Sequence, residues 1–402
     1  MGGGTLIKIM SLQPVYIVAA SLVLTIIPIT SSIPLRVYLA IYQVMLVFFL
    51  VQVINGFDDL NYQIISSQFL YSILYTWIGF CVYIIFRNDH ESFTRMYAAS
   101  MSVLIVYTIF SHLIIYFFNI SKIVLVTASN AYYKGLFVFF SERIRTDYLG
   151  YDVREIIFGL ELPRFHGIFW EPSVFVTYAA LLLYVGLYVT RRRLHVFLAT
   201  IGLLGAQSLT GFVLLIVCYL WLYLRPAANV DLRMSKYRRT GRFLVALILF
   251  GSGVTSIGYA LLNTEFSTDK IGSISQRFYD TAGAFYTIAA NPAFGVGLNM
   301  DYYDLEIENL NIIDAIDANI STFSLNEKDE IKYSNSVLRL FVKVGIPFGC
   351  LFLFGLYRQT LFDSRHRVLL FVLILLGSSA APILEMSFLF SLVISGLVHS
   401  RN

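Results

Sequence analysis

Charged residues are scarce in this sequence. Asp, Glu, Lys and Arg make up 13% of the 402 residues, whereas hydrophobic residues make up 57%. A soluble globular domain carries about 25% charged residues, so the composition excludes that class. The mean hydropathy of +0.72 points the same way. The net charge of only +4 gives no support to nucleic-acid binding.

Cysteine is also rare. Cys81, Cys218 and Cys350 all lie in apolar runs, so we expect no disulfide in the polar loops. The sequence lacks the CxxC and Cys/His spacings that are typical of metal sites, and we expect neither a metal nor another cofactor. It also lacks the paired half-repeats that many transporters carry.

Long apolar runs are what the sequence does have. They predict an all-α polytopic integral membrane protein, a single transmembrane domain over residues 1–402 with about 11–12 transmembrane helices. Two of the runs are short and are separated only by Ser208 and Leu209, which predicts a tight hairpin or a partly re-entrant pair. The candidate spans lie at about 13–31, 35–54, 67–86, 97–119, 168–189, 195–207, 210–224, 243–262, 336–357, 367–381 and 383–398.

Three arginine-rich clusters set the expected orientation. They lie at 191–193, 225–242 and 358–367, and the positive-inside rule places all three in the cytoplasm. Large loops at 120–167 and 263–335 then face outward. The second loop holds 12 Asp or Glu against four basic residues, which favours the same orientation. Eleven spans would leave the N-terminus outside, unless a further helix precedes residue 165.

The first candidate functional stretch is RFHGIFWEPS at 164–173, which opens an apolar run. It places Arg164, His166 and Glu171 at the predicted outer membrane surface. Pro172 suits the first turn of a helix, and a carboxylate at Glu171 is favoured near that positive end. The stretch is typical either of an interfacial anchor in the aromatic belt or of a site that carries chemistry.

The second stretch predicts an amphipathic interfacial helix near 275–290, because apolar residues recur there at helical spacing. The helix should end before Pro292, since the residue before a proline is pushed out of the helical region. Arg277 would then lie at the height of the lipid headgroups. Gly295 and Gly297 permit a tight loop that approaches another group closely.

The third stretch places Asn335, Arg339 and Lys343 four residues apart, so that they form one polar stripe along an apolar helix. A charged residue exposed to lipid at the centre of a helix costs roughly 2.5–3.5 kcal/mol. Arg339 could extend to the surface, but Lys343 is too deep for that. We therefore expect a polar cavity that opens outward. With Arg164 and Arg277 it would suit a diphosphate carried by a lipid.

These motifs resemble those of the superfamily of Wzy-type O-antigen polymerases and O-antigen ligases of bacterial inner membranes. Each motif is loose, but their order and their expected side of the membrane agree with that superfamily. The residues that carry the resemblance are Arg164-x-x-Gly167-x-x-x-Glu171-Pro172-Ser173, Arg277 followed by Asn291-Pro292-x-x-Gly295-x-Gly297, and Ser334-Asn335-x-x-Leu338 followed by Gly345-Ile346.

The resemblance implies a metal-independent glycosyltransferase in a bacterial inner membrane, with its active site facing the periplasm. The donor would be an oligosaccharide on undecaprenyl diphosphate, and the acceptor a sugar hydroxyl. A chain-length-regulating co-polymerase is a candidate partner beside the lipid bilayer. Arg164 and Arg277 would hold the diphosphate. The substrate site would also include Gly295, Gly297, Asn335, Arg339 and Lys343.

One departure from the family pattern decides between its branches. Ligases carry a histidine just before the asparagine of the third motif, where this sequence has Ser334. A serine is no general base near neutral pH, so a polymerase of repeat units is favoured and a ligase is the alternative. The base stays open among Glu171, His166 and Asp280. A lipid-linked oligosaccharide flippase or transporter ranks third, because the ionisable groups gather at one surface.

Overall fold

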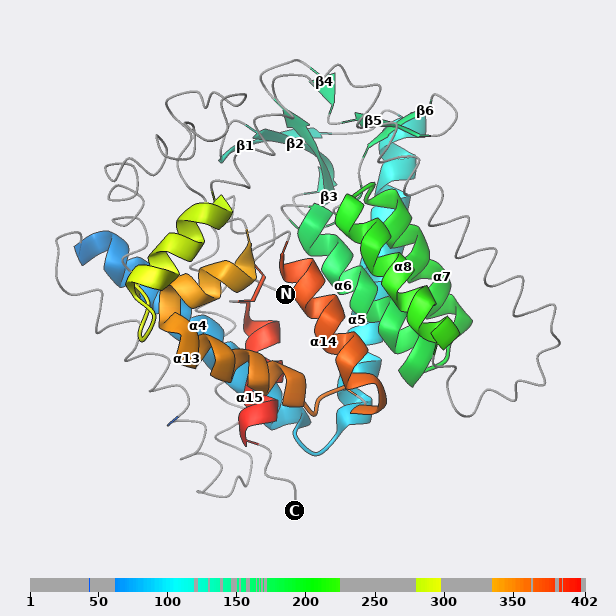
Figure 1. The fold of residues 1–402 in the computed structure, drawn as a ribbon. Helices are drawn as coiled ribbons and strands as arrows, with labels where there is room; N and C mark the ends of the chain where they lie inside the picture. Colours follow the sequence, from blue (N-terminus) through cyan, green and yellow to red (C-terminus); the bar gives the residue numbers. More distant parts are fainter. Residues whose placement is uncertain are drawn as a thin grey trace. The chain divides into compact units, whose positions relative to one another are not determined.

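A computed structural model describes the larger part of the chain, and most of the described residues are helical (Figure 1). The described residues are 43, 62–118, 122–128, 131–137, 140–145, 150–151, 153–156, 160–163, 165, 167, 169, 172–224, 280–297, 335–362, 364–379, 383–384 and 386–398.

The chain divides into two compact units. The elements of unit 1 are α5 (His90–Phe118), β1 (Lys122–Ala128), β2 (Ala131–Phe137), β3 (Phe140–Arg145), β4 (Gly150–Tyr151), β5 (Val153–Ile156), β6 (Leu160–Pro163), α6 (Pro172–Tyr184), the π-helix η3 (Val185–Val189), α7 (Arg193–Gly205), α8 (Leu209–Leu224), the 3-10 turn η4 (Ser364–His366) and α14 (Arg367–Ser378). The elements of unit 2 are α4 (Tyr62–Phe86), a helix at 280–290, α13 (Ser336–Arg358) and α15 (Ser387–Val398).

Helices occupy every predicted span that the structure describes. Among the described residues, three helical stretches are long and apolar enough to cross a membrane, namely His90–Ser111, Pro172–Val189 and Ser336–Arg358. Helices α7, α8, α14 and α15 are apolar but shorter. The predicted spans at 13–31 and 243–262 lie outside the described residues, as does the span at 35–54 apart from Gln43.

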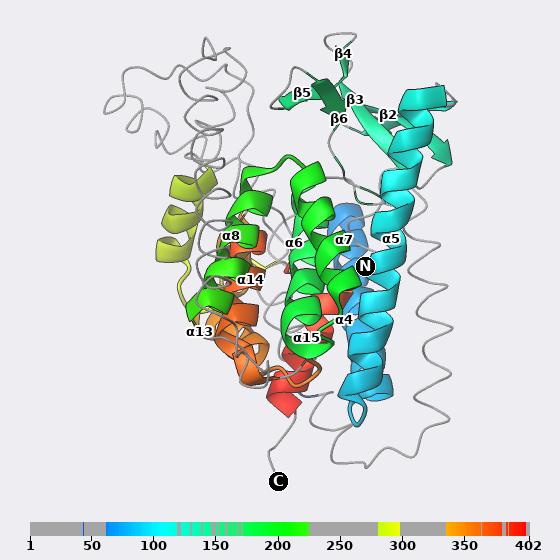
Figure 2. The ribbon, with the colours of Figure 1, turned by 90° about the vertical axis from the view of Figure 1, so that its right-hand side faces the viewer.

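In unit 1, α5, α6, α7 and α8 lie side by side (Figure 2). The short runs at 195–207 and 210–224 form two antiparallel neighbours, as the sequence predicts. Their connection turns at Gln207, whose φ of +46° reverses the chain. The N–H of Gln207 donates to the carbonyl of Leu204 at 3.0 Å, so the turn also satisfies the end of α7.

Strands occur within the loop predicted at 120–167, where the all-α prediction allowed for none. β1 to β4 form an antiparallel sheet in sequence order, and β5 pairs with β6. Ala128 pairs with Ala131, so only Ser129 and Asn130, residue types that favour turns, connect the first two strands. Valine, isoleucine and aromatic residues are frequent from 122 to 145, and these residue types favour strands.

In unit 2, α15 packs against both α4 and α13. Glycines permit these close approaches. A Cβ atom on Gly79 would lie 2.7 Å from the carbonyl oxygen of Ser387, and one on Gly396 would collide with the carbonyl of Gly355. Close packing over small residues is how helices associate in an apolar solvent, where the hydrophobic effect does not drive them together.

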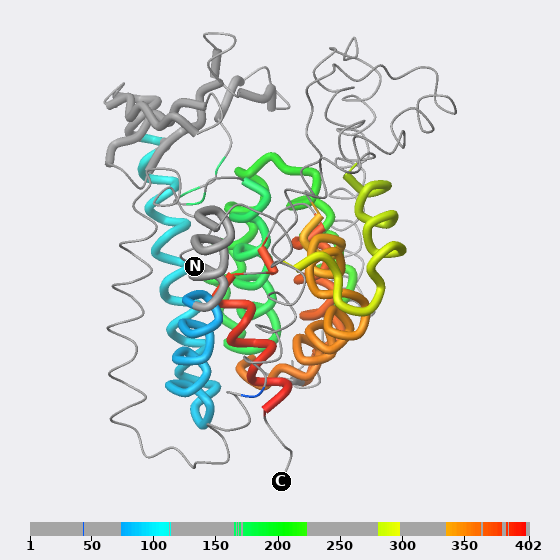
Figure 3. Tube along the Cα trace, turned by 90° about the vertical axis from the view of Figure 1, so that its left-hand side faces the viewer, coloured from blue at the N-terminus to red at the C-terminus, as the bar shows by residue number. Residues whose placement is uncertain are grey.

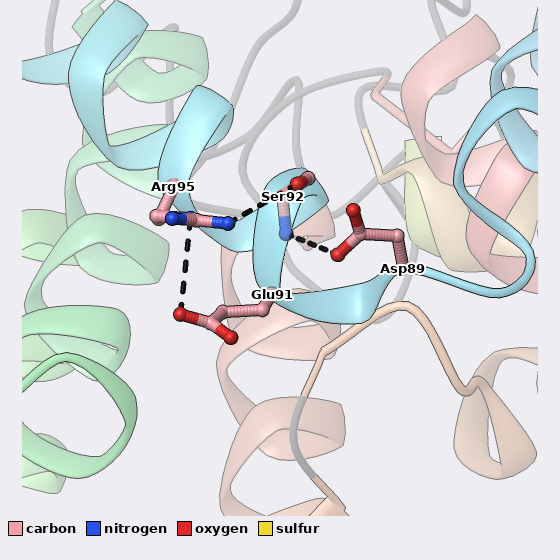
Figure 4. A network of polar contacts seen from close by, with 4 residues as sticks. All are labelled: Asp89, Glu91, Ser92 and Arg95. Carbon is pink, nitrogen blue, oxygen red and sulfur yellow. Dashed lines mark hydrogen bonds and ion pairs between the residues drawn. The ribbon is translucent and has the colours of Figure 1, made fainter.

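The start of α5 is fixed by a network of polar contacts (Figure 4). The backbone N–H of Ser92 donates to the Asp89 carboxylate at 2.8 Å, so Asp89 is the N-cap of the helix. Hydrogen bonds from the side chain and the backbone of Ser92 lower the pKa of Asp89 below its ordinary value of 3.8. Arg95 donates to the Ser92 hydroxyl at 3.3 Å and lies 3.9 Å from the Glu91 carboxylate.

We predict that Asp89→Ala lowers the melting temperature at pH 7, and that Asp89→Asn, which keeps an acceptor but not the charge, lowers it less. Because the folded pKa is lowered, the charged cap stabilises the protein above the unfolded pKa and loses this effect as the pH falls through the folded pKa. The difference in melting temperature between the wild type and Asp89→Ala should therefore narrow below pH 3.8. Glu91→Ala is the control, since its exposed pair contributes little. A constant difference at all pH values would contradict the assignment.

Candidate functional site

The predicted site residues divide between the two units. Those that the structure describes all belong to unit 2, and they are Asp280, Gly295, Gly297, Asn335, Arg339 and Lys343. The other predicted residues, Arg164, His166, Glu171 and Arg277, lie outside the described residues. In the first motif, at 164–173, the structure describes Phe165, Gly167 and Phe169, which lie between the predicted site residues.

Three residues of the first motif anchor it to unit 1. The N–H of Phe165 donates to the carbonyl of Gly205 at 2.8 Å, and its ring fills the place that a side chain at position 205 would need. Gly167 has a φ of +58°, and a Cβ there would lie 2.8 Å from the Thr108 hydroxyl oxygen. The buried Phe169 ring stacks on Tyr178 with centroids 5.1 Å apart. The motif is thus tied to α5, α6 and α7 at alternate residues.

Asp280 lies in the helix described at 280–290 and is only 2% exposed. A buried carboxylate requires a hydrogen-bond donor or a cation. Asp280 is therefore placed to hold such a group inside unit 2, and it is shielded from bulk water. The helix ends before Pro292, as the sequence predicts.

Helix α13 is broken at Gly345, which has a φ of 76° and a ψ of 175°. Figure 3 shows the segment at 280–297 in yellow beside α13 in orange. At the break, Ile346 donates its N–H to the carbonyl of Pro292 at 2.8 Å and not to a carbonyl of its own helix. The interruption at Gly345, which we call the α13 break, is therefore bridged by a hydrogen bond to the loop at 291–297.

The carbonyls that the α13 break releases are satisfied by the same loop. The N–H of Val296 donates to the carbonyl of Val342 at 2.8 Å, and the N–H of Gly297 donates to that of Lys343 at 2.9 Å. A regular helix would pair the Lys343 carbonyl with residue 347, which is a proline and has no N–H. The loop therefore supplies a donor that the helix cannot.

The two motif glycines make this approach possible. Gly295 and Gly297 have φ values of +67° and +64°, a conformation that favours glycine. A Cβ on Gly295 would collide with the carbonyl of Val342, and one on Gly345 would lie 2.5 Å from the carbonyl of Ala293. The close approach that the sequence predicts for these glycines is thus an approach to the backbone of α13.

The polar stripe lies on the first half of α13. Lys343 is 7% exposed and belongs to the buried face of the helix, together with Leu340 and Val344. Arg339 lies one turn earlier and is half-buried, with its Nε atom shielded from solvent. Ile346 and Phe354, by contrast, point outward. Two basic side chains thus lie one turn apart on an apolar helix, an arrangement that is typical of a binding site or a wet cavity.

Asn335 has a structural task that the sequence did not reveal. Its side-chain oxygen accepts hydrogen bonds from the N–H groups of Val337 at 2.9 Å and Leu338 at 3.3 Å, so it is the N-cap of α13. The next residue, Ser336, accepts a hydrogen bond from the N–H of Leu384 at 3.0 Å. The start of the stripe is therefore fixed at two adjacent positions.

Sequence reasoning missed the role of Gly345 and Pro347, although the signal was present. A glycine followed two residues later by a proline inside a predicted span indicates a break. Among the described residues, no three His, Cys, Asp or Glu side chains gather.

No family model matches the chain, and no match is found among the curated proteins or the solved structures. The resemblance to O-antigen polymerases and ligases therefore rests on the motifs alone.

We predict that Gly345→Ala destabilises the folded protein by roughly 1–3 kcal/mol, because alanine is strained at this φ and its Cβ meets a backbone carbonyl. Gly295→Ala should act similarly. The variant Gly295→Ala/Gly345→Ala should lose less stability than the sum of the two single losses, since both glycines permit one set of hydrogen bonds. The measurement is thermal unfolding in detergent.

The control for this experiment is Cys350→Ala, which lies exposed on the same helix. If Gly345→Ala melted together with this control, the α13 break would be wrongly described.

Proposed function

We propose that the protein is a polymerase of lipid-linked oligosaccharide repeat units. It would act in a bacterial inner membrane, with its active site facing the periplasm. The observation that carries the proposal is the pair Arg339 and Lys343, one turn apart on the apolar helix α13. Ionisable residues inside an apolar helix are costly to keep and typically mark a binding site or a transport path.

The reaction proposed is transfer of a glycan from undecaprenyl diphosphate to a sugar hydroxyl. The bond between the anomeric carbon and the diphosphate oxygen breaks, and the acceptor oxygen bonds to that carbon. The hydroxyl proton passes to a base, for which Glu171, His166 and Asp280 are the candidates. The leaving diphosphate gains negative charge, which a guanidinium stabilises. Arg164 and Arg277 are each proposed to bind phosphate oxygens in this way.

The described geometry supports an anionic substrate in one further respect. Lys343 lies on the first half of α13 and its carbonyl is occupied by Gly297, so the backbone around it is fixed. A charge held on a fixed backbone is preorganised and needs little rearrangement when a diphosphate arrives.

We predict that Arg277→Ala and Arg164→Ala each lower polymer formation on the order of 10²–10³-fold at normal protein level, because each removes a phosphate-binding guanidinium. Arg→Lys at either position should restore activity only in part, since an ammonium cannot bind phosphate through two parallel hydrogen bonds. The measurement is glycan profiling of a native-host deletion strain that carries each variant. Lys270→Ala, another basic residue of the loop at 263–335, is the matched control.

The deletion strain itself separates the candidate activities. Loss of the polymer ladder with a single capped repeat retained supports a polymerase, whereas loss of all surface glycan supports a ligase or a flippase. Full activity of both alanine variants would remove the two arginines from the mechanism.

The α13 stripe gives a second prediction. Arg339→Leu should abolish polymer in a folded, membrane-inserted protein, whereas Lys343→Leu should impair polymer formation less or act through stability. Arg339 is half-buried and within reach of a ligand, whereas Lys343 is covered. Activity and melting temperature are measured on the same preparations. Equal activity of Arg339→Leu and the wild type would rule out the stripe as a substrate site.

A further inference from the structure

Unit 1 carries five arginines that the proposed reaction does not use. Arg191, Arg192 and Arg193 form the turn between η3 and α7, and all three are exposed. Arg365 and Arg367 flank His366 at the start of α14. We refer to these five residues as the arginine cluster.

Contacts of His366 bring the two turns to the same end of unit 1. The indole N–H of Trp221, near the end of α8, donates to Nδ1 of His366 at 3.1 Å. The ring of Tyr188, three residues before Arg191, lies with its centroid 4.5 Å from that of His366. Aromatic packing therefore joins the turn at 191–193 to the turn at 365–367.

The backbone adds positive potential at this end. α7 begins at Arg193, and its N-cap Arg192 makes no side-chain capping bond. α14 begins at Arg367, and neither helix has an acidic residue in its first turn. Helix N-termini favour anions and are normally accompanied by acidic or capping residues. The two helix N-termini therefore add to the positive potential of the five arginines.

The segments at 172–224 and 364–379 contain no Asp or Glu. On α5, which packs beside η3, Glu91 is paired with Arg95 and Asp89 caps the helix. Asp363 lies outside the described residues. In addition, Nε of Arg367 is buried and has no hydrogen-bond partner among the described residues.

An apolar surface begins next to the arginines. Leu194 and Phe197 are 62% and 61% exposed, and their spacing of three places them on one face of α7. A free phosphate ion would leave this surface unused. A phospholipid would use both parts, with its phosphate at the arginines and an acyl chain along α7.

We propose that the arginine cluster is a binding site for the phosphate headgroup of an anionic phospholipid. The lipid comes from the leaflet that the positive-inside rule makes cytoplasmic. Several guanidinium groups share its phosphate oxygens. The acyl chain lies against Leu194 and Phe197. This site is separate from the proposed polymerase reaction, which takes place on the opposite side.

The test is native mass spectrometry of the delipidated full chain titrated with phosphatidylglycerol, phosphatidylcholine or inorganic phosphate. The wild type should bind phosphatidylglycerol at least about tenfold more tightly than phosphatidylcholine, and added salt should weaken this binding. The variant Arg191→Gln/Arg193→Gln/Arg367→Gln should lose on the order of a hundredfold in affinity for phosphatidylglycerol, at about fivefold for each arginine. Arg233→Gln/Arg238→Gln/Arg239→Gln, which removes the same charge elsewhere in the sequence, is the matched control.

A further variant, Leu194→Ser/Phe197→Ser, distinguishes a lipid from a free phosphate. It should weaken phosphatidylglycerol binding and leave the effect of inorganic phosphate unchanged. The proposal is overturned if phosphatidylglycerol and phosphatidylcholine bind equally to the wild type, a result that needs no variant to fold. It is also overturned if inorganic phosphate displaces the lipid at equal concentration while the serine variant binds lipid normally, which would indicate a soluble phosphate ligand.

Discussion

Three backbone hydrogen bonds between the loop at 291–297 and the broken helix α13 hold unit 2 in its described form. A break inside an apolar helix exposes peptide groups that cannot bond to water there, and each unsatisfied group costs several kcal/mol. The donors at Val296 and Gly297 and the acceptor at Pro292 remove that cost. Because these residues directly follow the helix at 280–290, the same bonds fix the position of Asp280 relative to α13.

The α13 break also explains how a lysine is accommodated at position 343. The first half of α13 ends at the break, so Lys343 lies in its last turn. The carbonyl end of a helix carries a partial negative charge, and a cation is favoured there by about 0.3–1 kcal/mol at a surface and more in a partly buried place. An unbroken helix would place the same lysine in mid-helix without this stabilisation. The break at Gly345 and Pro347 therefore places Lys343 where the end of the helix stabilises its charge.

The positions of the helices were predictable from apolar runs, because burial of about 20 residues in lipid leaves few alternatives to a helix. The hydrogen-bond or packing partner of each polar group or glycine was not predictable. Asn335 has the spacing of a stripe with Arg339 and Lys343, yet its side chain caps its own helix. Gly295 and Gly297 have the spacing of a substrate loop, yet their close approach is to α13. Local spacing identifies which residues are unusual, whereas the contacts that they make depend on segments distant in sequence. The strands between 122 and 163 were missed for a related reason, since the pairing of short segments depends on their partners, although valine, isoleucine and aromatic residues from 122 to 145 favour strands.

The arginines of unit 1 show how two constraints can act on the same residues. Orientation in a membrane depends on the number of positive charges in a loop and not on their arrangement. Topology alone therefore does not require the Trp221 indole to bond to His366, nor the arginine-bearing turns to start α7 and α14 without an acidic residue. These features determine where the charges lie relative to one another. A fixed arrangement of guanidinium groups is what distinguishes a phosphate site from a loop that is merely positive.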